Sequence, residues 1–467
     1  MSQANSLFRT KPIDPNANTG LKRCLTSWDL VLLGIGCIIG TGIFVLTGVA
    51  AAQHAGPGIV LSFVISGTAC AFAALCYAEL SGAVGGAGSA YGYAYVGIGE
   101  FPAWVIGWLL LLEYSVATAT VSIGWSGYFG SILDAFFGVK LPLAWTAAPA
   151  EGGIANVPAM LIVLTIASLL CWGVKESARF NNGMVVVKVA TILAFIAIAG
   201  PHVNVDNWTP FIPERTEDGR YGFMGVTTAA ALIFFAYIGF DAVSTAGEEA
   251  VNPQRDLPIG ILGSLVICTV LYIIVSAILT GVVPYQEIDQ KAPVAEAMGR
   301  LGITWAKGMV ATGAIFGITT VMLVLYYALT RVVLAMSRDG LLPSGMAAVH
   351  PVRQTPVRLI LGSGLVIAFI AGFFPIGKVA ELVNLGTLGA FFLVCLSVII
   401  LRRTRPELKR PFKTPLVPLI PILGMGFCAW LMASLPAATW IAFTLWMALG
   451  LATYFLYSRQ RSTLNAR

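Results

Sequence analysis

The first apolar segment carries the stretch GIGCIIGTGIF, residues Gly34 to Phe44, in which four glycines interrupt a hydrophobic run. Two interpretations are open. Gly36 and Gly40 have the spacing that lets two membrane helices pack closely. Alternatively, the helix unwinds here and exposes backbone N–H and C=O groups to a ligand. The spacing is not that of the dinucleotide-binding fingerprint, and no strand precedes it, which excludes a nucleotide-binding fold.

A second interrupted stretch, FFAYIGFDAVSTAGEE, occupies Phe234 to Glu249 in the sixth apolar segment. It places Gly239 and then Asp241 inside an otherwise apolar run. Two interrupted helices at corresponding positions of two halves are typical of transporters built from inverted repeats around a central site. This stretch therefore favours unwinding over packing in the first segment. Segments 1 to 5 and 6 to 10 would form the repeats, with segments 11 and 12 as additions.

Composition is that of a membrane protein. Hydrophobic residues make up 57% of the 467 residues and charged residues only 11%, whereas a soluble domain carries about 25% charged residues. The first apolar segment is too long for the core of a signal peptide, so we expect it to remain and span. The cysteines show no paired spacing and the three histidines fall at expected helix ends or loops, so we expect neither a metal site nor an enzyme.

A helix needs about 20 apolar residues to cross a membrane, and twelve stretches of the sequence meet this requirement. We therefore expect an all-α integral membrane protein with twelve transmembrane helices. The segments run roughly over 29–50, 58–82, 101–130, 156–174, 182–200, 223–247, 259–282, 305–336, 356–374, 379–401, 417–435 and 438–457. The expected organisation is an N-terminal tail (1–28), a ten-helix core (29–401), helices 11 and 12 with a preceding basic loop (402–457) and a C-terminal tail (458–467).

Lysine and arginine concentrate in alternate loops. If both termini are cytoplasmic, 20 of the 28 basic residues fall on the cytoplasmic side and 7 on the outer side, with Lys188 alone inside a segment. Because cytoplasmic loops carry the excess of positive charge, we expect a multi-pass protein of the plasma (inner) membrane with both termini inside. The basic run from Arg402 to Lys413 then anchors the chain on the inner leaflet, which accounts for it better than nucleic-acid binding does.

Ionisable residues inside spanning helices cost roughly 2.5 to 3.5 kcal/mol each on insertion scales, so each needs a partner or a purpose. Glu113, Lys188 and Asp241 are the three that stand out. Asp241 adjoins the expected unwinding, which favours a functional role. For Glu113, a structural hydrogen bond and a role near the substrate or in proton transfer are equally open. Glu79 and Asp29 lie near helix ends, where reaching toward water suffices, and we assign them structural roles.

Together, several motifs resemble bacterial members of the cationic amino acid transporter family, in the amino acid, polyamine and organocation superfamily. The resemblance covers nearly the whole chain. It implies a five-plus-five inverted-repeat, leucine-transporter-like core with broken helices 1 and 6, and a proton-coupled amino-acid permease. The motifs are the two interrupted stretches, LCYAELSG at 75–82, NPQRDLPIGI at 252–261 and SRDGLLP at 337–343.

The resemblance also assigns roles by position. In segment 1 it implies a backbone site for the substrate's ammonium and carboxylate, and in segment 6 the facing side, with Phe235 as a gate. The implied substrate residues are Ile38, Thr41, Gly42, Phe235, Ala236, Ile238 and Leu325, and the implied coupling or gating residues are Lys188, Asp241, Glu113 and Phe235.

The expected substrate is a neutral, small amino acid. A broken helix offers N–H groups to a carboxylate and carbonyls to an ammonium, so one zwitterion suits both ends. Leu325 matches the pocket position that should face the side chain, and a leucine cannot compensate an arginine. A Lys or Arg transporter and an amino-acid exchanger remain the alternatives. The tails are too short for a signalling domain, which disfavours a nutrient sensor, and the sequence does not specify an oligomeric state.

No cofactor is expected beyond a proton as the coupling ion. Related folds that use sodium hold one ion between segments 1 and 8, and the resemblance places Lys188 near that position. An ammonium with three donors and the same unit charge could replace the ion, so we expect no sodium site.

Overall fold

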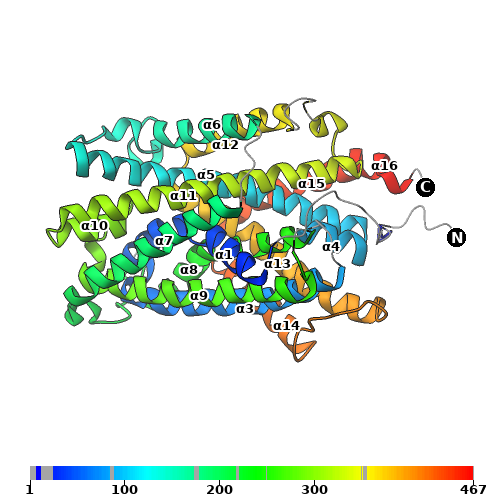
Figure 1. Cartoon of the computed structure of the whole chain (residues 1–467), viewed down its shortest axis with the longest axis horizontal. Coiled ribbons are helices and arrows are strands. Elements are labelled where there is room, and N and C mark those ends of the chain that lie inside the picture. Colours follow the sequence, from blue (N-terminus) through cyan, green and yellow to red (C-terminus); the bar gives the residue numbers. More distant parts are fainter. Residues whose placement is uncertain are drawn as a thin grey trace.

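The computed structural model describes residues 7–11, 25–84, 89–172, 178–216, 220–248, 250–348, 350 and 355–465. Within these residues every named element is helical, and one isolated bridge joins Leu25 to Ala250. Most long helices run side by side along the long axis of the molecule, and both termini lie at the same end (Figure 1). The α-helices are α1 (Ser27–Ile38), α2 (Thr47–Ala50), α3 (Ile59–Val84), α4 (Ser89–Gly97), α5 (Glu100–Phe137), α6 (Val157–Trp172), α7 (Ala178–Ala199), α8 (Gly222–Ile233), α9 (Pro253–Val282), α10 (Pro293–Arg300), α11 (Thr304–Arg338), α12 (Val357–Phe373), α13 (Ile376–Thr404), α14 (Leu419–Ala433), α15 (Ala437–Thr453) and α16 (Arg459–Arg461).

Eight helical stretches in the described part of the chain are long and apolar enough to cross a membrane. All twelve expected segments overlap either one of these stretches or a shorter apolar helix. The number of crossings and the inverted repeat stay predictions, because length and composition alone qualify only the eight. The eight stretches are Gly42–Ala83, Glu100–Phe137, Gly183–His202, Gly222–Ser244, Pro253–Val282, Thr304–Arg338, Ile376–Thr404 and Ala437–Arg461, and the shorter helices are Ser27–Ile38, Val157–Trp172, Val357–Phe373 and Leu419–Ala433.

The first glycine-rich stretch is a helix break. Helix α1 ends at Ile38, and Ile39 is extended, with φ −73° and ψ 105°. Helical structure resumes as the π-helical element η2 (Gly42–Leu46) and continues through α2. The structure therefore shows unwinding here rather than an uninterrupted packing helix.

The second stretch is broken as well. Helix α8 ends at Ile233 and tightens into the 3₁₀ turn η9 (Phe234–Tyr237), after which Ile238 is extended, with ψ 133°. Gly239 has φ 117°, a conformation open to glycine and costly for other residues. The chain then turns into a second 3₁₀ element, η10 (Asp241–Glu248).

The two breaks touch each other through their glycines. A Cβ added at Gly42 would lie 2.3 Å from the Cα of Ala236, and one added at Gly239 would lie 2.9 Å from the carbonyl carbon of Cys37. Each break therefore packs a bare glycine against the backbone of the other. Side chains of ordinary size at these positions would separate the two unwound segments.

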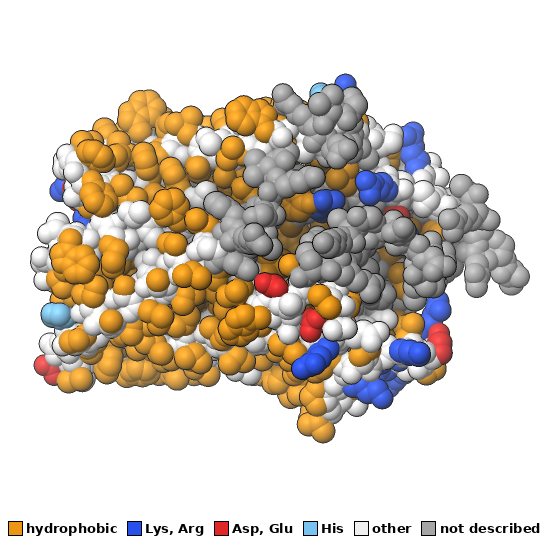
Figure 2. All heavy atoms as spheres, in the orientation of Figure 1, with side chains coloured by type: hydrophobic (Ala, Val, Ile, Leu, Met, Phe, Trp, Pro, Cys, Tyr) orange, Lys and Arg blue, Asp and Glu red, His pale blue; other side chains and the backbone are white. Residues whose placement is uncertain are grey.

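Hydrophobic side chains cover most of the visible flank of the molecule, while lysine and arginine side chains gather at the end that carries the termini (Figure 2). Exposed apolar residues such as Leu161, Val266 and Leu365 lie on helices that face outward. Such a surface suits a lipid environment rather than water.

Two expectations about charges need correction. Glu79 does not reach toward water: it is 1% exposed, and Arg402 binds both of its carboxylate oxygens at 2.9 and 2.7 Å. Arg410 adds a second ion pair at 3.4 Å. A buried carboxylate needs such partners, because desolvation is costly for an unpaired charge. Part of the basic run expected to anchor the inner leaflet therefore binds Glu79 instead.

Candidate functional site

A small cavity of about 10 Å³, enough for about one water molecule, lies between the two breaks. Its walls come from the break in segment 1, from the 3₁₀ turn of segment 6, and from the long helices α5 and α11, which pack together. The lining residues are Cys37, Ile38, Gly40, Thr41, Gly42, Val121, Phe235, Ile238, Val321 and Leu325.

The structure brings the predicted substrate residues together. Six of the seven line the cavity, and the seventh, Ala236, lies directly behind Gly42. Residues from segments 1, 6 and 8 thus converge as the sequence predicted, although their role in binding stays a prediction. Phe235 is 5% exposed and lines the cavity, and its role as a gate stays a prediction.

Carbonyl groups freed by the breaks are bound by side chains from neighbouring helices. The Lys188 ammonium donates to the Gly36 carbonyl at 2.5 Å. The Tyr272 hydroxyl, from α9, lies 2.9 Å from the Ile38 carbonyl and 3.0 Å from the Ala236 carbonyl, so it bridges both breaks. In this way buried backbone groups that lost their helical partners remain hydrogen-bonded.

Lys188 lies between two elements that the sequence linked to it. Its side chain is fully buried, and a Cβ added at Gly317 of α11 would lie 2.9 Å from its Cγ. The lysine therefore runs from α7 past α11 to the end of α1. Lys188 therefore lies between segments 1 and 8, and its replacement of a sodium ion stays a prediction.

Asp241 supports the second break from within. One carboxylate oxygen accepts a hydrogen bond from the Gly239 N–H at 3.2 Å, and the other accepts one from the Tyr114 hydroxyl at 3.2 Å. The Ser244 hydroxyl closes the following turn on the Asp241 carbonyl at 2.5 Å. The carboxylate thus holds the positive-φ glycine in place and ties η10 to α5.

Glu113 is not among the residues that line the cavity. It is fully buried, and neither of its carboxyl oxygens has a hydrogen-bond partner among the described residues. The Tyr77 hydroxyl and the Thr387 hydroxyl are also buried without a partner there. A buried carboxyl in this position carries its proton or holds water, because an isolated charge would be too costly. Both the structural and the proton-transfer interpretations of Glu113 stay open.

Four lining or bridging residues escaped the sequence analysis. Val121 of α5, Val321 of α11 and Cys37 of α1 line the cavity, and Tyr272 bridges the breaks. Each is an ordinary apolar or aromatic residue within an apolar helix. Only the spacing of segments 3 and 8 around a central site could have pointed to the valines.

The cavity has one apolar face and one backbone face. Among the described residues that line it none carries a charge, and Thr41 is the one with a hydroxyl, which bonds the Val121 carbonyl at 3.4 Å. The helical run that begins at Gly42 offers the positive end of its dipole to an anionic group. The arrangement suits a small molecule with charged ends and an apolar body.

Comparison with known proteins gives the family. The family model described as amino acid permease matches residues 25–462. The chain is 50% identical to the methylthioribose transporter of Bacillus subtilis (strain 168), over 99% of this chain and 100% of that protein. It is 48% identical to the branched-chain amino acid permease BcaP of the same organism, over 98% and 99% of the two chains. It is 36% identical to the vacuolar cationic amino acid transporter 4 of Arabidopsis thaliana, over 86% and 68%.

These matches cover almost the whole chain. They confirm the resemblance to the cationic amino acid transporters, which are less similar to this chain than the two bacterial relatives are. They also agree with the all-helical structure of the described residues. The protein is a membrane transporter and belongs to the amino acid permease family.

Proposed function

We propose that this amino-acid permease carries neutral amino acids with a small or aliphatic side chain, by alternating access and with protons as the coupling ion. The observation that carries the proposal is the uncharged cavity between the two helix breaks. A zwitterion could place its carboxylate near the helix start at Gly42 and its ammonium near the carbonyls at the end of η9.

The side chain of the substrate would lie against Val121, Val321 and Leu325. A lysine or arginine side chain would leave its charge unpaired there, at a cost of several kcal/mol in a low-dielectric site. The similarity to a branched-chain amino acid permease also supports an aliphatic substrate. The cationic alternative is therefore disfavoured.

Methylthioribose is the competing substrate, because a relative that is 50% identical is named for its transport. A ribose carries several hydroxyl groups, each of which needs a polar partner when buried. The lining offers few polar side chains, Thr41 and Cys37 among them, which supports the amino acid over the sugar.

Coupling by protons is supported by the position of Lys188. Its ammonium donates a hydrogen bond to the Gly36 carbonyl near the end of α1, and its side chain lies between α1 and α11. A cation already present there would exclude sodium by charge and by volume. Lys188, Asp241 and Glu113 remain the candidates for carrying the proton.

Both termini are proposed to lie in the cytoplasm, with the protein spanning the plasma (inner) membrane. Support comes from the excess of lysine and arginine at the end of the molecule where the termini lie (Figure 2). Positive charge next to spanning helices favours the cytoplasmic side. Reporter fusions to each terminus test this directly, and an external signal from either would contradict it.

The decisive experiment is uptake into proteoliposomes. Labelled leucine, alanine, arginine and methylthioribose would be offered with and without an inward proton gradient, and with and without sodium. We expect leucine and alanine to accumulate with the gradient and sodium to make no difference. Strong preference for arginine or methylthioribose would overturn the substrate proposal. Uptake that needs an internal amino acid instead of the gradient would identify an exchanger.

A further inference from the structure

The N-terminal tail lies across the end of the helical bundle, ahead of the first helix. The Phe101 N–H donates to the Leu7 carbonyl, the Glu100 N–H to the Arg9 carbonyl, and the Lys11 N–H to the Tyr95 carbonyl, each at 3.0 Å. These bonds hold the tail in register with the connection between α4 and α5. The tail is therefore bound in one defined position.

Gly99, in that connection, is the surface against which the tail packs. It has φ 131°, and a Cβ added there would lie 2.5 Å from the Cα of Phe8. Only glycine combines this backbone conformation with so close an approach. The connection between α4 and α5 thus has the backbone shape that the tail requires.

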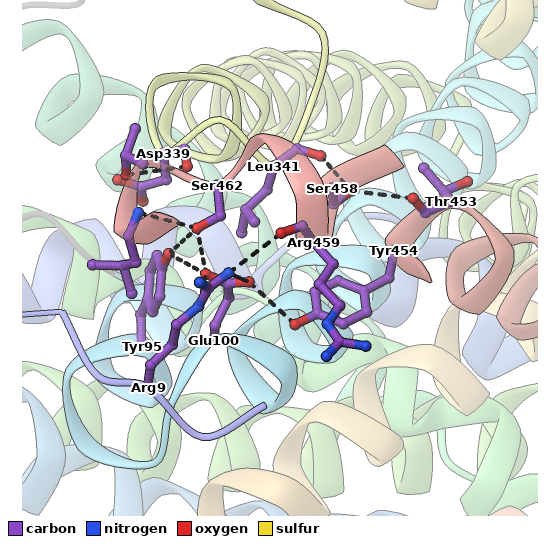
Figure 3. Close-up of polar contacts among 12 residues, drawn as sticks. Arg9, Tyr95, Glu100, Asp339, Leu341, Thr453, Tyr454, Ser458, Arg459 and Ser462 are labelled. Carbon is purple, nitrogen blue, oxygen red and sulfur yellow. Dashed lines mark hydrogen bonds and ion pairs between the residues drawn. The ribbon is translucent and has the colours of Figure 1, made fainter. Parts of the chain in front are cut away.

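Glu100 is the centre of the arrangement (Figure 3). It is fully buried, and Arg9 binds both of its oxygens, at 3.1 and 2.8 Å. The hydroxyls of Tyr95 and Tyr454 each donate to it at 3.1 Å, and the Ser462 hydroxyl donates a further bond. Residues from both tails and from two helices therefore satisfy one carboxylate.

A second ion pair lies beside the first. Lys11 binds one oxygen of Asp339 at 2.8 Å, and the Tyr91 hydroxyl donates to the other at 2.8 Å. The Asp339 carbonyl accepts from the N–H and the hydroxyl of Thr463, in the C-terminal tail. Asp339 directly follows α11, so this pair fixes the tails to that helix as well.

Helix α4 extends the contacts to the second helix break. Its Tyr93 hydroxyl donates to the Ser244 carbonyl in η10 at 3.1 Å. Tyr91 and Tyr95 of the same short helix bind Asp339 and Glu100. One helix thus connects the broken segment 6 to the ends of α5 and α11, the two long helices that line the cavity.

We propose that this clasp, defined as Arg9, Lys11, Tyr91, Tyr95, Glu100, Asp339 and Ser462, keeps the cavity closed toward the end of the molecule that carries the termini. For substrate to pass at that end, η10 and α1 must separate from α5 and α11. The tail bonds to Glu100 and Asp339 hold α4 against α5 and α11, and the Tyr93–Ser244 bond holds η10 to α4. Together these bonds resist that separation. The proposal rests on transport by alternating access.

Alkylation of Cys37 provides the measurement, because this cysteine lines the cavity and is 3% exposed. A membrane-impermeant maleimide would be added to vesicles from the side of the termini, and peptide mass spectrometry would identify labelled Cys37. We expect Lys11→Ala, which removes one half-exposed ion pair, to speed labelling about twofold to fivefold. Arg9→Ala with Lys11→Ala should speed it about tenfold or more, since the Arg9 pair is buried and doubly bonded.

Ser462→Ala tests the C-terminal arm and should also speed labelling. Reagent on the opposite side should label Cys37 no faster in any of these variants. Arg300→Ala is the matched control, since Arg300 pairs with Glu287 on exposed surface, and α10 lies at the far end of the molecule from the termini (Figure 1). It should leave the labelling rate unchanged.

Unchanged labelling in both Lys11→Ala and Ser462→Ala, in protein that elutes as a single peak, would overturn the clasp. Faster labelling in Arg300→Ala to the same extent would overturn it too, because the effect would then be unspecific. The substrate proposal fails separately: if the unmodified protein takes up no amino acid but the clasp variants still label faster, the clasp stands and the function does not.

Discussion

The two helix breaks solve the same physical problem in different ways. In segment 1, the freed carbonyls of Gly36 and Ile38 are bound by side chains from other helices, Lys188 and Tyr272. In segment 6, the Gly239 N–H is bound by Asp241, two residues further along the same chain. Segment 6 is also supported from other helices, since Asn384 of α13 donates to the carbonyls of Ala231 and Leu232 and Tyr272 donates to that of Ala236. Of the two breaks, however, only the second has a carboxylate of its own as a further support.

This difference suggests which break can change with the transport cycle. A break supported by its own carboxylate keeps its shape as its helix moves, because the partner moves with it. A break supported from α7 and α9 changes its hydrogen bonds whenever α1 shifts against those helices. We therefore expect substitutions at the supports of segment 1 to affect transport more than stability, and those within segment 6 to affect both.

The contact between the breaks should be the most sensitive point. We expect Gly42→Val to abolish binding and uptake, since even its Cβ would lie 2.3 Å from the Cα of Ala236. Overpacking costs about 1–3 kcal/mol even where side chains can yield, and backbone yields less. Gly426→Val in α14 is the control, because a Cβ there meets nothing within 4 Å. Normal leucine uptake by Gly42→Val would show that the breaks need not touch.

Removal of the Lys188 ammonium from the first break should have the second largest effect on uptake. Lys188→Ala leaves the Gly36 carbonyl without this donor, and hydrogen bonds to charged groups contribute about 1.5–3 kcal/mol. We expect uptake to fall at least about tenfold and its proton dependence to disappear, while the protein still inserts. Lys378→Ala, which removes an exposed lysine paired with Glu381, should have no effect.

Two results would contradict this account of Lys188. Sodium-dependent uptake by the unmodified protein would refute the replacement of an ion by the lysine. Proton-driven uptake that survives in Lys188→Ala would remove Lys188 from the coupling mechanism and leave it a structural tie between helices.

Substitution of Asp241, which supports the second break, should reduce uptake less than the two changes above. Asp241→Asn keeps an oxygen that can accept the Gly239 N–H but removes the charge, so we expect the break to persist and uptake to fall about fivefold to tenfold. Tyr114→Phe removes the other bond to the carboxylate and leaves the charge in place. If uptake loses its proton dependence to the same extent in both variants, proton coupling requires the hydrogen bond between Tyr114 and Asp241 and not the charge of Asp241.

Both breaks could be predicted from the sequence because glycine in an apolar run is conspicuous, and so is a charge such as Lys188 or Asp241. Their partners could not be predicted. Tyr272 is one aromatic residue among many in apolar helices, and nothing local indicates that it faces two carbonyls. The same holds for Val121 and Val321, whose place in the cavity wall depends on how α5 and α11 pack.

The partners of charged residues near helix ends could not be predicted for a related reason. Glu79 reads locally as a carboxylate within reach of water, but its partner Arg402 lies 323 positions further along the chain. Glu100 lies directly before the expected third segment, and nothing in the local sequence indicates that both tails converge on it. Pairings over such separations are set by the tertiary fold, so the local pattern shows the charge and not the contact.

The smallest expected effect concerns Tyr272, which joins the two breaks. A tyrosine hydroxyl has a single hydrogen to donate, yet it lies within 3.0 Å of the carbonyls of both Ile38 and Ala236. One carbonyl is therefore always bound less well, and the hydroxyl can follow whichever break moves toward it. Tyr272→Phe removes about one net hydrogen bond, about 1 kcal/mol.

We expect Tyr272→Phe to raise the KM for leucine about fivefold and to leave the maximal rate nearly unchanged. The carbonyls would lose the same support in every state of the cycle in which the breaks stay together, so binding suffers more than turnover. Tyr326→Phe, which removes a bond from α11 to the Ile360 carbonyl of α12, is the matched control and should not change KM. A fall in maximal rate with an unchanged KM would mean instead that Tyr272 acts in the movement between states, exchanging one carbonyl for the other as the breaks part.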